Sequence, residues 1–172
     1  MKDELLNLAK KLKIDLNKEM IDKFLLYKEL LKEWNEKINL TAIIEDREIL
    51  LKHFIDSLTI EKYINKNDSI IDVGTGAGFP GIPLKIVRKD IKITLLDSLN
   101  KRLLFLDEVR QKVNLDNVNI VHGRAEDIGN KIDFREKYDI ATARAVANLA
   151  VLAEYCLPFI KVGRSFYMYE RK

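Results

Sequence analysis

From residue 69 onward, short apolar runs alternate with longer segments whose apolar residues recur at helical spacing. The runs predict buried strands, and the longer segments predict helices. Strands are expected at about 69–73, 91–96, 118–122, 138–143 and 165–169, and helices near 82–88, 99–114 and 146–157. Such an alternation is typical of an α/β fold with a parallel, doubly wound sheet and right-handed crossovers. Ligands of these sheets bind at the carboxyl ends of the strands.

The first 67 residues carry only the helical pattern. Helices are predicted over residues 3–13, from Asn17 as N-cap to about Lys37, and from Asp46 as N-cap through Leu58. The polar stretch 65–68 then separates this helical part from the first strand. We therefore expect an N-terminal helical extension, 1–67, packed on an α/β body, 68–172, within one structural domain overall.

Composition narrows the class of protein. A chain of 172 residues with 47% hydrophobic and 33% charged residues is typical of one soluble domain with a full core. The single Cys156, the absence of a long apolar run and the lysine-rich, acidic start predict a cytoplasmic protein without a membrane segment. Two histidines and one cysteine, widely separated, give no metal-ligand spacing, and a net charge of +3 does not by itself indicate nucleic acid.

The first strand of the body runs directly into a glycine-rich turn. Gly74, Gly76 and Gly78 follow Val73 at alternate positions, and a helix is predicted to begin near Ile82. Glycine allows the sharp turn and lets a ligand lie against bare main chain, so the backbone of Gly78 is expected to contact a cofactor. Strand, glycine turn and helix together predict a nucleotide-type cofactor site without metal.

Two cofactors fit this turn. Gly76, Gly78 and Gly81 match the dinucleotide pattern G-x-G-x-x-G, which would make the protein a nicotinamide-dependent oxidoreductase. Asp72, however, is expected to face the ligand, where a carboxylate repels pyrophosphate and attracts the ammonium group of a methionine moiety. Asp97 ends the next strand and can hold ribose hydroxyls of either cofactor. The balance favours S-adenosylmethionine.

Two further strand ends carry candidate residues. After the third strand, Glu126 or Asp127, with the backbone of Ala125, could recognise an adenine edge or could equally form a helix N-cap. Arg144 follows the fourth strand, where a role with substrate or cofactor competes with a surface salt bridge.

Several motifs together resemble the GidB/RsmG family, which are bacterial methyltransferases acting on guanine N7 in small-subunit (16S) ribosomal RNA. They are DVGTGAGFPGIPL from Asp72, LLDSLNKR from Leu95, GRAE from Gly123 and ARAVA from Ala143, with WNEKINLT from Trp34 and HFIDS from His53. The resemblance implies a Rossmann-like S-adenosylmethionine-dependent methyltransferase sheet with an N-terminal helical extension.

The resemblance also implies roles for particular residues. Those expected to bind S-adenosylmethionine are Gly74, Phe79, Asp97, Ala125, Glu126 and Arg144. Another four match family positions for which helix caps and core hydrogen bonds are the conservative interpretation: Asn39, Thr41, His53 and Asp56.

Methylation of guanine N7 requires little side-chain chemistry. This nitrogen has an in-plane lone pair and no hydrogen, so catalysis needs alignment rather than a general base. Arg144, as the catalytic positioning residue, and Arg124 are candidates to donate to guanine O6. Cations expected to meet RNA phosphates are Lys85, Arg88, Lys101, Arg102 and Lys161. An RNA-binding module with an inactive cofactor site is the other interpretation.

The chain ends at Lys172, before the helix and two strands with which this family usually continues. The last strands are therefore expected to be missing, which leaves Ser165–Tyr169 as an open sheet edge. That edge predicts self-association or a disordered tail after Gly163, and cofactor binding that survives better than methyl transfer.

Overall fold

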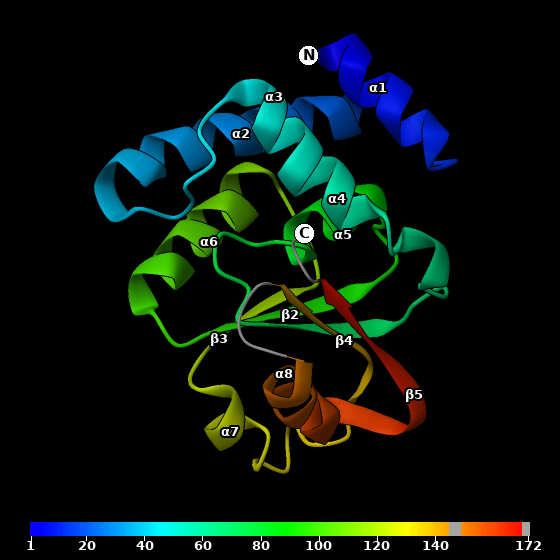
Figure 1. Ribbon diagram of the computed structural model, residues 1–172, viewed down its shortest axis with the longest axis vertical. Helices are drawn as coiled ribbons and strands as arrows, with labels where there is room; N and C mark the ends of the chain where they lie inside the picture. Colours follow the sequence, from blue (N-terminus) through cyan, green and yellow to red (C-terminus); the bar gives the residue numbers. More distant parts are fainter. Residues whose placement is uncertain (145–148, 170–172) are drawn as a thin grey trace.

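The computed structural model describes residues 1–144 and 149–169, and its five strands form one parallel sheet (Figure 1). The strands are β1 (Ser69–Val73), β2 (Lys92–Asp97), β3 (Val118–His122), β4 (Tyr138–Arg144) and β5 (Ile160–Tyr169). Their order is β3-β2-β1-β4-β5, and every neighbouring pair is parallel. The order reverses between β1 and β4, which is where doubly wound sheets bind their ligands.

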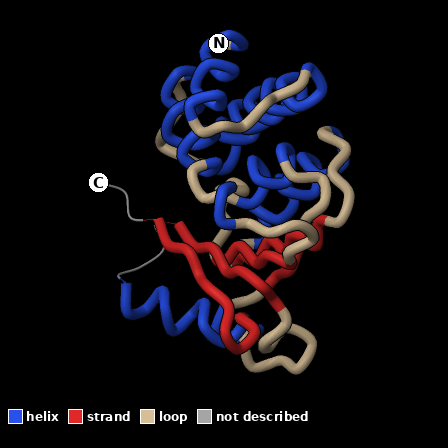
Figure 2. Tube along the Cα trace, turned by 90° about the vertical axis from the view of Figure 1, so that its right-hand side faces the viewer, coloured by secondary structure: helices blue, strands red, loops and turns tan. Residues whose placement is uncertain are grey.

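Helices cover both faces of this sheet. The helices of the described residues are α1 (Lys2–Lys11), α2 (Lys18–Ile38), α3 (Asp46–Ile49), α4 (Asp56–Leu58), α5 (Gly81–Val87), α6 (Asn100–Lys112), α7 (Ala125–Ile128) and α8 (Leu149–Cys156). A π-helical segment, Leu50–Ile55, joins α3 to α4, and 3-10 turns occupy Glu61–Tyr63 and Leu157–Phe159. Figure 2 shows the N-terminal helices and α5 on one side of the sheet and α8 on the other.

Neighbouring residues of the strands enter two different cores. Ile70 belongs to a core that continues through Phe24 of α2 to Leu5 of α1, whereas Ile71 belongs to a second core with Leu152 of α8. This alternation follows from the period of two along a strand. The apolar face of the N-terminal helices is therefore buried directly against the layer that covers the sheet. The division of the chain into a helical extension, 1–67, and an α/β body stays a prediction.

The predicted elements agree with the structure within a few residues, except that β5 begins earlier, that α7 is not predicted, and that a π-helical segment interrupts the helix predicted from Asp46. β5 begins at Ile160, five residues before the predicted start at 165; it contains Gly163 with φ +80°, and a register shift occurs opposite Tyr138 and Ile140 of β4. Gly163, after which a disordered tail is one of the two expectations, lies inside a strand that continues to Tyr169. The predicted helix 146–157 corresponds to α8, and its first residues, 146–148, lie outside the described residues.

The two predicted helix caps differ in outcome. The side chain of Asn17 accepts a hydrogen bond from the Met20 N–H at 2.9 Å, which confirms it as the N-cap of α2. Asp46 does not cap α3, because Glu45 holds the N-cap position. The carboxylate of Asp46 instead pairs with Lys28 and, at 2.7 Å, with Lys32. In the described part of the chain, no helix combines the length and apolarity needed to cross a bilayer.

Candidate functional site

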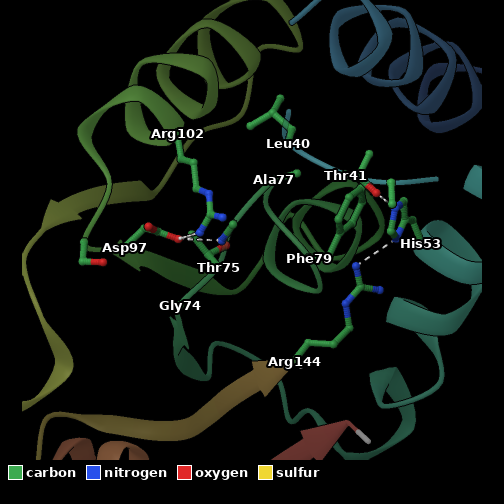
Figure 3. Close-up of a pocket in the computed structure, with 13 residues that line it drawn as sticks. Leu40, Thr41, His53, Gly74, Thr75, Ala77, Phe79, Asp97, Arg102 and Arg144 are labelled. Carbon is green, nitrogen blue, oxygen red and sulfur yellow. Dashed lines mark hydrogen bonds and ion pairs between the residues drawn. The ribbon is translucent and has the colours of Figure 1, made fainter. Parts of the chain in front are cut away.

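Two adjoining cavities lie at the carboxyl ends of β1 and β2, where the sheet order predicts a ligand. The first, of about 430 Å³, is lined by the glycine turn and by residues of the N-terminal helical part (Figure 3). The second, of about 310 Å³, extends toward α7 and α8. Gly74, Asp97 and Ser98 line both. Each cavity falls in the size range of small-molecule sites, and together they can hold an elongated ligand.

The glycine turn presents bare backbone to the first cavity at Gly74 and Gly76. Both have the left-handed backbone that side chains disfavour, with φ of +65° and +60°. A Cβ atom added to Gly76 would meet only the carbonyl oxygen of Gly74, at 3.9 Å. These two glycines therefore form the part of the turn that a ligand can lie against.

Gly78 packs closely against the core. A Cβ atom there would lie 2.7 Å from Ile82, 2.9 Å from Leu106 and 2.9 Å from the hydroxyl of Tyr27. Gly78 is buried and lines neither cavity, and its contact with the cofactor stays a prediction. Tyr27, which is fully buried, also donates its hydroxyl to the carbonyl of Ala77 in the same turn.

Gly81, the last glycine of the dinucleotide pattern, is also buried. A Cβ atom at this position would lie 2.5 Å from Leu95. In dinucleotide sites the second glycine of the pattern gives room to the pyrophosphate. Here that second glycine is Gly78, which faces apolar side chains, so the pattern does not form a pyrophosphate cradle.

Asp72 lies beneath the turn, so the prediction that it faces the ligand is wrong in this structure. Its carboxylate is fully buried and accepts from the hydroxyl of Thr75 at 2.7 Å, the N–H of Gly81 at 3.0 Å and the hydroxyl of Thr142 at 3.1 Å. Burial raises the pKa of this carboxyl to about 6, although those hydrogen bonds oppose the shift. Asp72 ties the turn to α5 and β4.

Asp97 lies where the two cavities meet, as the sequence predicts for a ribose-binding acid. Its carboxylate accepts from the N–H of Gly76 and the N–H of Leu99, both at 2.9 Å. The guanidinium of Arg102 lies 3.3 Å from the same carboxylate and lines the first cavity. The structure thus brings Arg102, predicted only as an RNA contact, into the wall of the cavity.

The second cavity collects the residues predicted after β3. Arg124, Ala125 and Glu126 line it, and Asp127 is not among its lining residues. The N-cap interpretation is wrong, since Arg124 holds the N-cap position of α7 and Glu126 lies in its first turn. Tyr155 of α8 also lines this cavity, and the nearby carboxylate of Glu126 raises the pKa of its phenol. Sequence reasoning missed Tyr155, because nothing in its helix distinguishes it from a core aromatic residue.

Arg144 ends β4 and points into the first cavity, with only 8% of its side chain exposed (Figure 3). Its guanidinium lies 4.8 Å from the centre of the Phe79 ring, which is a cation–π distance. It also donates to the carbonyl of Lys52 at 3.1 Å and lies 3.3 Å from the carboxylate of Asp56. Arg144 is therefore ion-paired and also part of the cavity wall, and its role with substrate or cofactor stays a prediction.

The helical part contributes two polar side chains to the same wall, Thr41 and His53. The ring of His53 stacks on Phe79 with the ring centres 4.3 Å apart, and Nδ1 lies 2.9 Å from Nη2 of Arg144. Asn39, in contrast, is exposed and forms the left-handed C-cap of α2, as the conservative interpretation expects. The sequence signal for a role of His53 is its spacing of three residues from Asp56, which places both side chains on one helical face.

Of the predicted phosphate contacts, that of Lys85 is wrong because this residue is buried, whereas Arg88 and Lys161 are paired with carboxylates and their contacts stay predictions. Lys85 is buried and donates to the carbonyls of Lys89 and Ile91. Arg88 is held by Glu61 and Asp90. Lys161 lies 3.0 Å from Asp139, near the amino end of β4 and therefore at the opposite end of the sheet from the cavities.

Lys101 remains an exposed cation at the start of α6. Within residues 1–144 and 149–169, no three histidine, cysteine or acidic side chains come together as a metal site.

Comparison with known proteins identifies the family. The family model for rRNA small subunit methyltransferase G, GidB, matches residues 20–172. Proteins named ribosomal RNA small subunit methyltransferase G include one from Acetivibrio thermocellus, 60% identical over 154 residues, and one from Alkaliphilus oremlandii, 54% identical over 168 residues. The alignments cover 89% and 96% of this chain, and 64% and 70% of the relatives. The chain thus spans about two thirds of the length of these relatives.

Solved structures agree on the fold. A SAM-dependent methyltransferase from Aquifex aeolicus aligns with a TM-score of 0.58 at 20% identity, over 77% of this chain and 74% of that one. A protein from Corynebacterium glutamicum aligns with a TM-score of 0.61 at 15% identity, over 83% and 66%. These likenesses confirm the predicted Rossmann-like sheet, and the match to residues 20–172 shows that the chain belongs to the GidB family of rRNA small subunit methyltransferase G.

Proposed function

We propose that this protein transfers a methyl group from S-adenosylmethionine to guanine N7 in small-subunit (16S) ribosomal RNA. The observation that carries the proposal is the pair of cavities that meet at Gly74 and Asp97, in a chain of this family. The second cavity offers two carboxylates, an arginine and a tyrosine, and the first offers bare glycine backbone and the Asp97 carboxylate beside two arginines. An elongated cofactor with a nucleoside at one end and a reactive group at the other matches that division.

The residues present fit S-adenosylmethionine. Asp97 would hold the ribose, since its side chain borders both cavities. Ala125 and Glu126 would flank the adenine in the second cavity, beside Tyr155. Gly74 and Gly76 would accommodate the methionine part against bare backbone, with Phe79 on the far wall of the first cavity. When bound, this cofactor supplies a methyl group on a positively charged sulfur.

The first cavity then serves to orient the target base. Guanine N7 needs no proton removed before it is methylated, so the wall has to align the ring and exclude water. The charged side chains that line this cavity are Asp97, Arg102 and Arg144. The guanidinium of Arg144 lies over the Phe79 ring and is suited to donate to guanine O6, next to the reacting nitrogen. Its role is to position the substrate.

Ribosomal RNA is the proposed macromolecular partner, which also implies a cytoplasmic protein. Arg102 and Arg124, at the rims of the two cavities, and the exposed Lys101 are the cations best placed to meet its phosphates. Such contacts position the RNA and do not identify the base. We also propose that copies of the chain associate through the outer edge of β5.

A labelled-methyl assay tests this function directly. The protein is incubated with S-adenosylmethionine labelled in the methyl group and with small-subunit RNA, both free and in the ribosomal subunit. We expect label at a guanine, released as 7-methylguanine on hydrolysis. Label at another base or ring position would contradict the assignment of N7. RNA binding without any transfer, with a chain of the relatives' length tested in parallel, would instead support the binding module with an inactive site.

A further inference from the structure

A chain of contacts leads from the N-terminal helical part to Arg144. Nε2 of His53 lies 2.9 Å from the hydroxyl of Thr41, and Nδ1 of His53 lies 2.9 Å from Nη2 of Arg144. Figure 3 shows this order of side chains along one wall of the first cavity. His53 and Arg144 are 91 residues apart in sequence, so the contact depends on how the helical part packs on the sheet.

The partners determine which nitrogen of His53 carries its proton. A guanidinium can only donate, so Nδ1 must accept from Arg144 and must carry no proton. The proton then lies on Nε2, which donates to the hydroxyl oxygen of Thr41. His53 is accordingly neutral in this arrangement, because a protonated ring would turn a second donor toward Arg144.

Both neighbours of the histidine ring are themselves held in place. The N–H of Thr41 donates to the side-chain oxygen of Asn35 at 2.7 Å, and its hydroxyl oxygen accepts from the N–H of Ile43 at 3.1 Å. The His53 ring is 2% exposed and nearly parallel to Phe79, at 14°. A ring fixed on two sides in this way presents its acceptor to Arg144 at a defined point.

We propose that His53 is a positioning residue for Arg144, and that Thr41 holds its ring in the Nε2–H form that this role requires. The inference rests on the function proposed above and assigns to the N-terminal helical part a direct share in that site. Arg144 keeps its orientation over Phe79 because His53, Asp56 and the carbonyl of Lys52 hold its guanidinium from one side. Without the Nδ1 acceptor of His53, the guanidinium of Arg144 would stay in the cavity but would lose its orientation over Phe79.

Two substitutions of His53 separate the acceptor from the packing. His53→Asn places an amide oxygen near the position of Nδ1, whereas His53→Phe keeps a flat ring on Phe79 and removes the acceptor. We expect His53→Phe to lower kcat by on the order of 100-fold, as for a displaced positioning group, and His53→Asn to recover most of that loss. Affinity for S-adenosylhomocysteine, measured by calorimetry, should fall less than kcat, because the proposed adenosine contacts lie in the second cavity.

Unchanged kcat in His53→Phe would overturn the proposal, and so would an Asn variant that stays folded and is as inactive as the Phe variant. Thermal unfolding of both variants shows whether each is folded. Arg47→Ala, which removes an exposed ion pair with Glu4 outside the site, is the control for the loss of an unrelated pair.

A second measurement needs no activity. The chain has two histidines, His53 and His122, so a two-bond proton–nitrogen spectrum of the imidazole rings is simple, and His122→Gln assigns it. We expect His53 to show a protonated Nε2 and an unprotonated Nδ1 at neutral pH, with the Nδ1 resonance displaced in Arg144→Ala. A proton on Nδ1 of His53 would overturn the proposal. Absence of methyl transfer by the unmodified protein would count against the proposed function alone, since the spectrum still tests the contact.

Discussion

The buried carboxylate of Asp72 makes the stability of the folded protein depend on pH. Its pKa of about 6 lies above the ordinary value of 3.8 because the folded protein buries it. The folded state therefore binds a proton more tightly than the unfolded state between these two values. The contribution of Asp72 to stability is full below about pH 4 and is lost as pH rises through 6. The rise of this pKa from 3.8 to about 6 corresponds to roughly 3 kcal/mol of folding free energy.

Asp72→Asn tests this residue. The amide can still accept from Thr75 and Gly81 and can donate to the hydroxyl of Thr142, and it has no charge to bury. We expect the variant's stability relative to the unmodified protein to rise between pH 4 and 6 and to stay level above that range. Urea unfolding of both proteins across pH 4 to 8 measures the difference, in which the other titrating groups cancel. A difference that does not vary with pH would contradict the shifted pKa.

At the scale of elements, the glycine turn divides into a ligand-facing half and a core-facing half. Gly76 and Gly78 have φ of +60° and +95°, so an alanine costs of the order of 1–2 kcal/mol in backbone strain at Gly76 and more at Gly78, whose φ lies outside the left-handed region. The added methyl group meets open space at Gly76 and three side chains within 3 Å at Gly78. The two variants therefore compare the two halves of the turn.

We expect Gly78→Ala to lose more stability than Gly76→Ala, because it carries more backbone strain and displaces Tyr27 and Leu106. Gly76→Ala should instead lose affinity for S-adenosylhomocysteine while it stays folded, since its methyl group projects into the first cavity. Chemical unfolding and calorimetry on both variants decide the matter. Equal losses of stability would mean that the core-facing contact at Gly78 can relax at little cost.

The same turn shows what could be predicted from the sequence. The alternation of apolar runs and helical segments placed all five strands and the glycine turn, because the periods of two and 3.6 are local properties. The position of Asp97 at the carboxyl end of β2 followed from topology alone. The direction in which Gly78 and Asp72 face could not be read, since it depends on Tyr27 and Thr142, far away in the chain. His53 could be matched to a family position but not to a role, for the same reason.

At the scale of the whole molecule, the outer edge of the sheet predicts association between copies. Among the described residues, β5 pairs with β4 on one side and with no strand on the other. Val162 of this strand is 91% exposed. Exposed strand edges pair readily with other chains, and a lysine there opposes the pairing.

We therefore expect the 172-residue chain to show a mass above that of the monomer in light scattering, increasing with concentration. Val162→Lys should return it toward the monomer, whereas Ile132→Lys, at another exposed apolar residue outside the strands, should not. A monomer at every concentration would contradict the association. A chain extended to the length of the relatives tells whether their additional third covers the same edge.

The hydrogen bond from Tyr27 to the carbonyl of Ala77 has a thermodynamic consequence. No residue of α2 lines either cavity, yet its buried tyrosine holds the backbone of the turn that does. The conformational free energies of the helix and the turn are therefore linked, and whatever orders one also favours the ordered state of the other. A cofactor that binds to the turn would therefore also stabilise the ordered state of α2, which lies on the side of the turn away from the cavities.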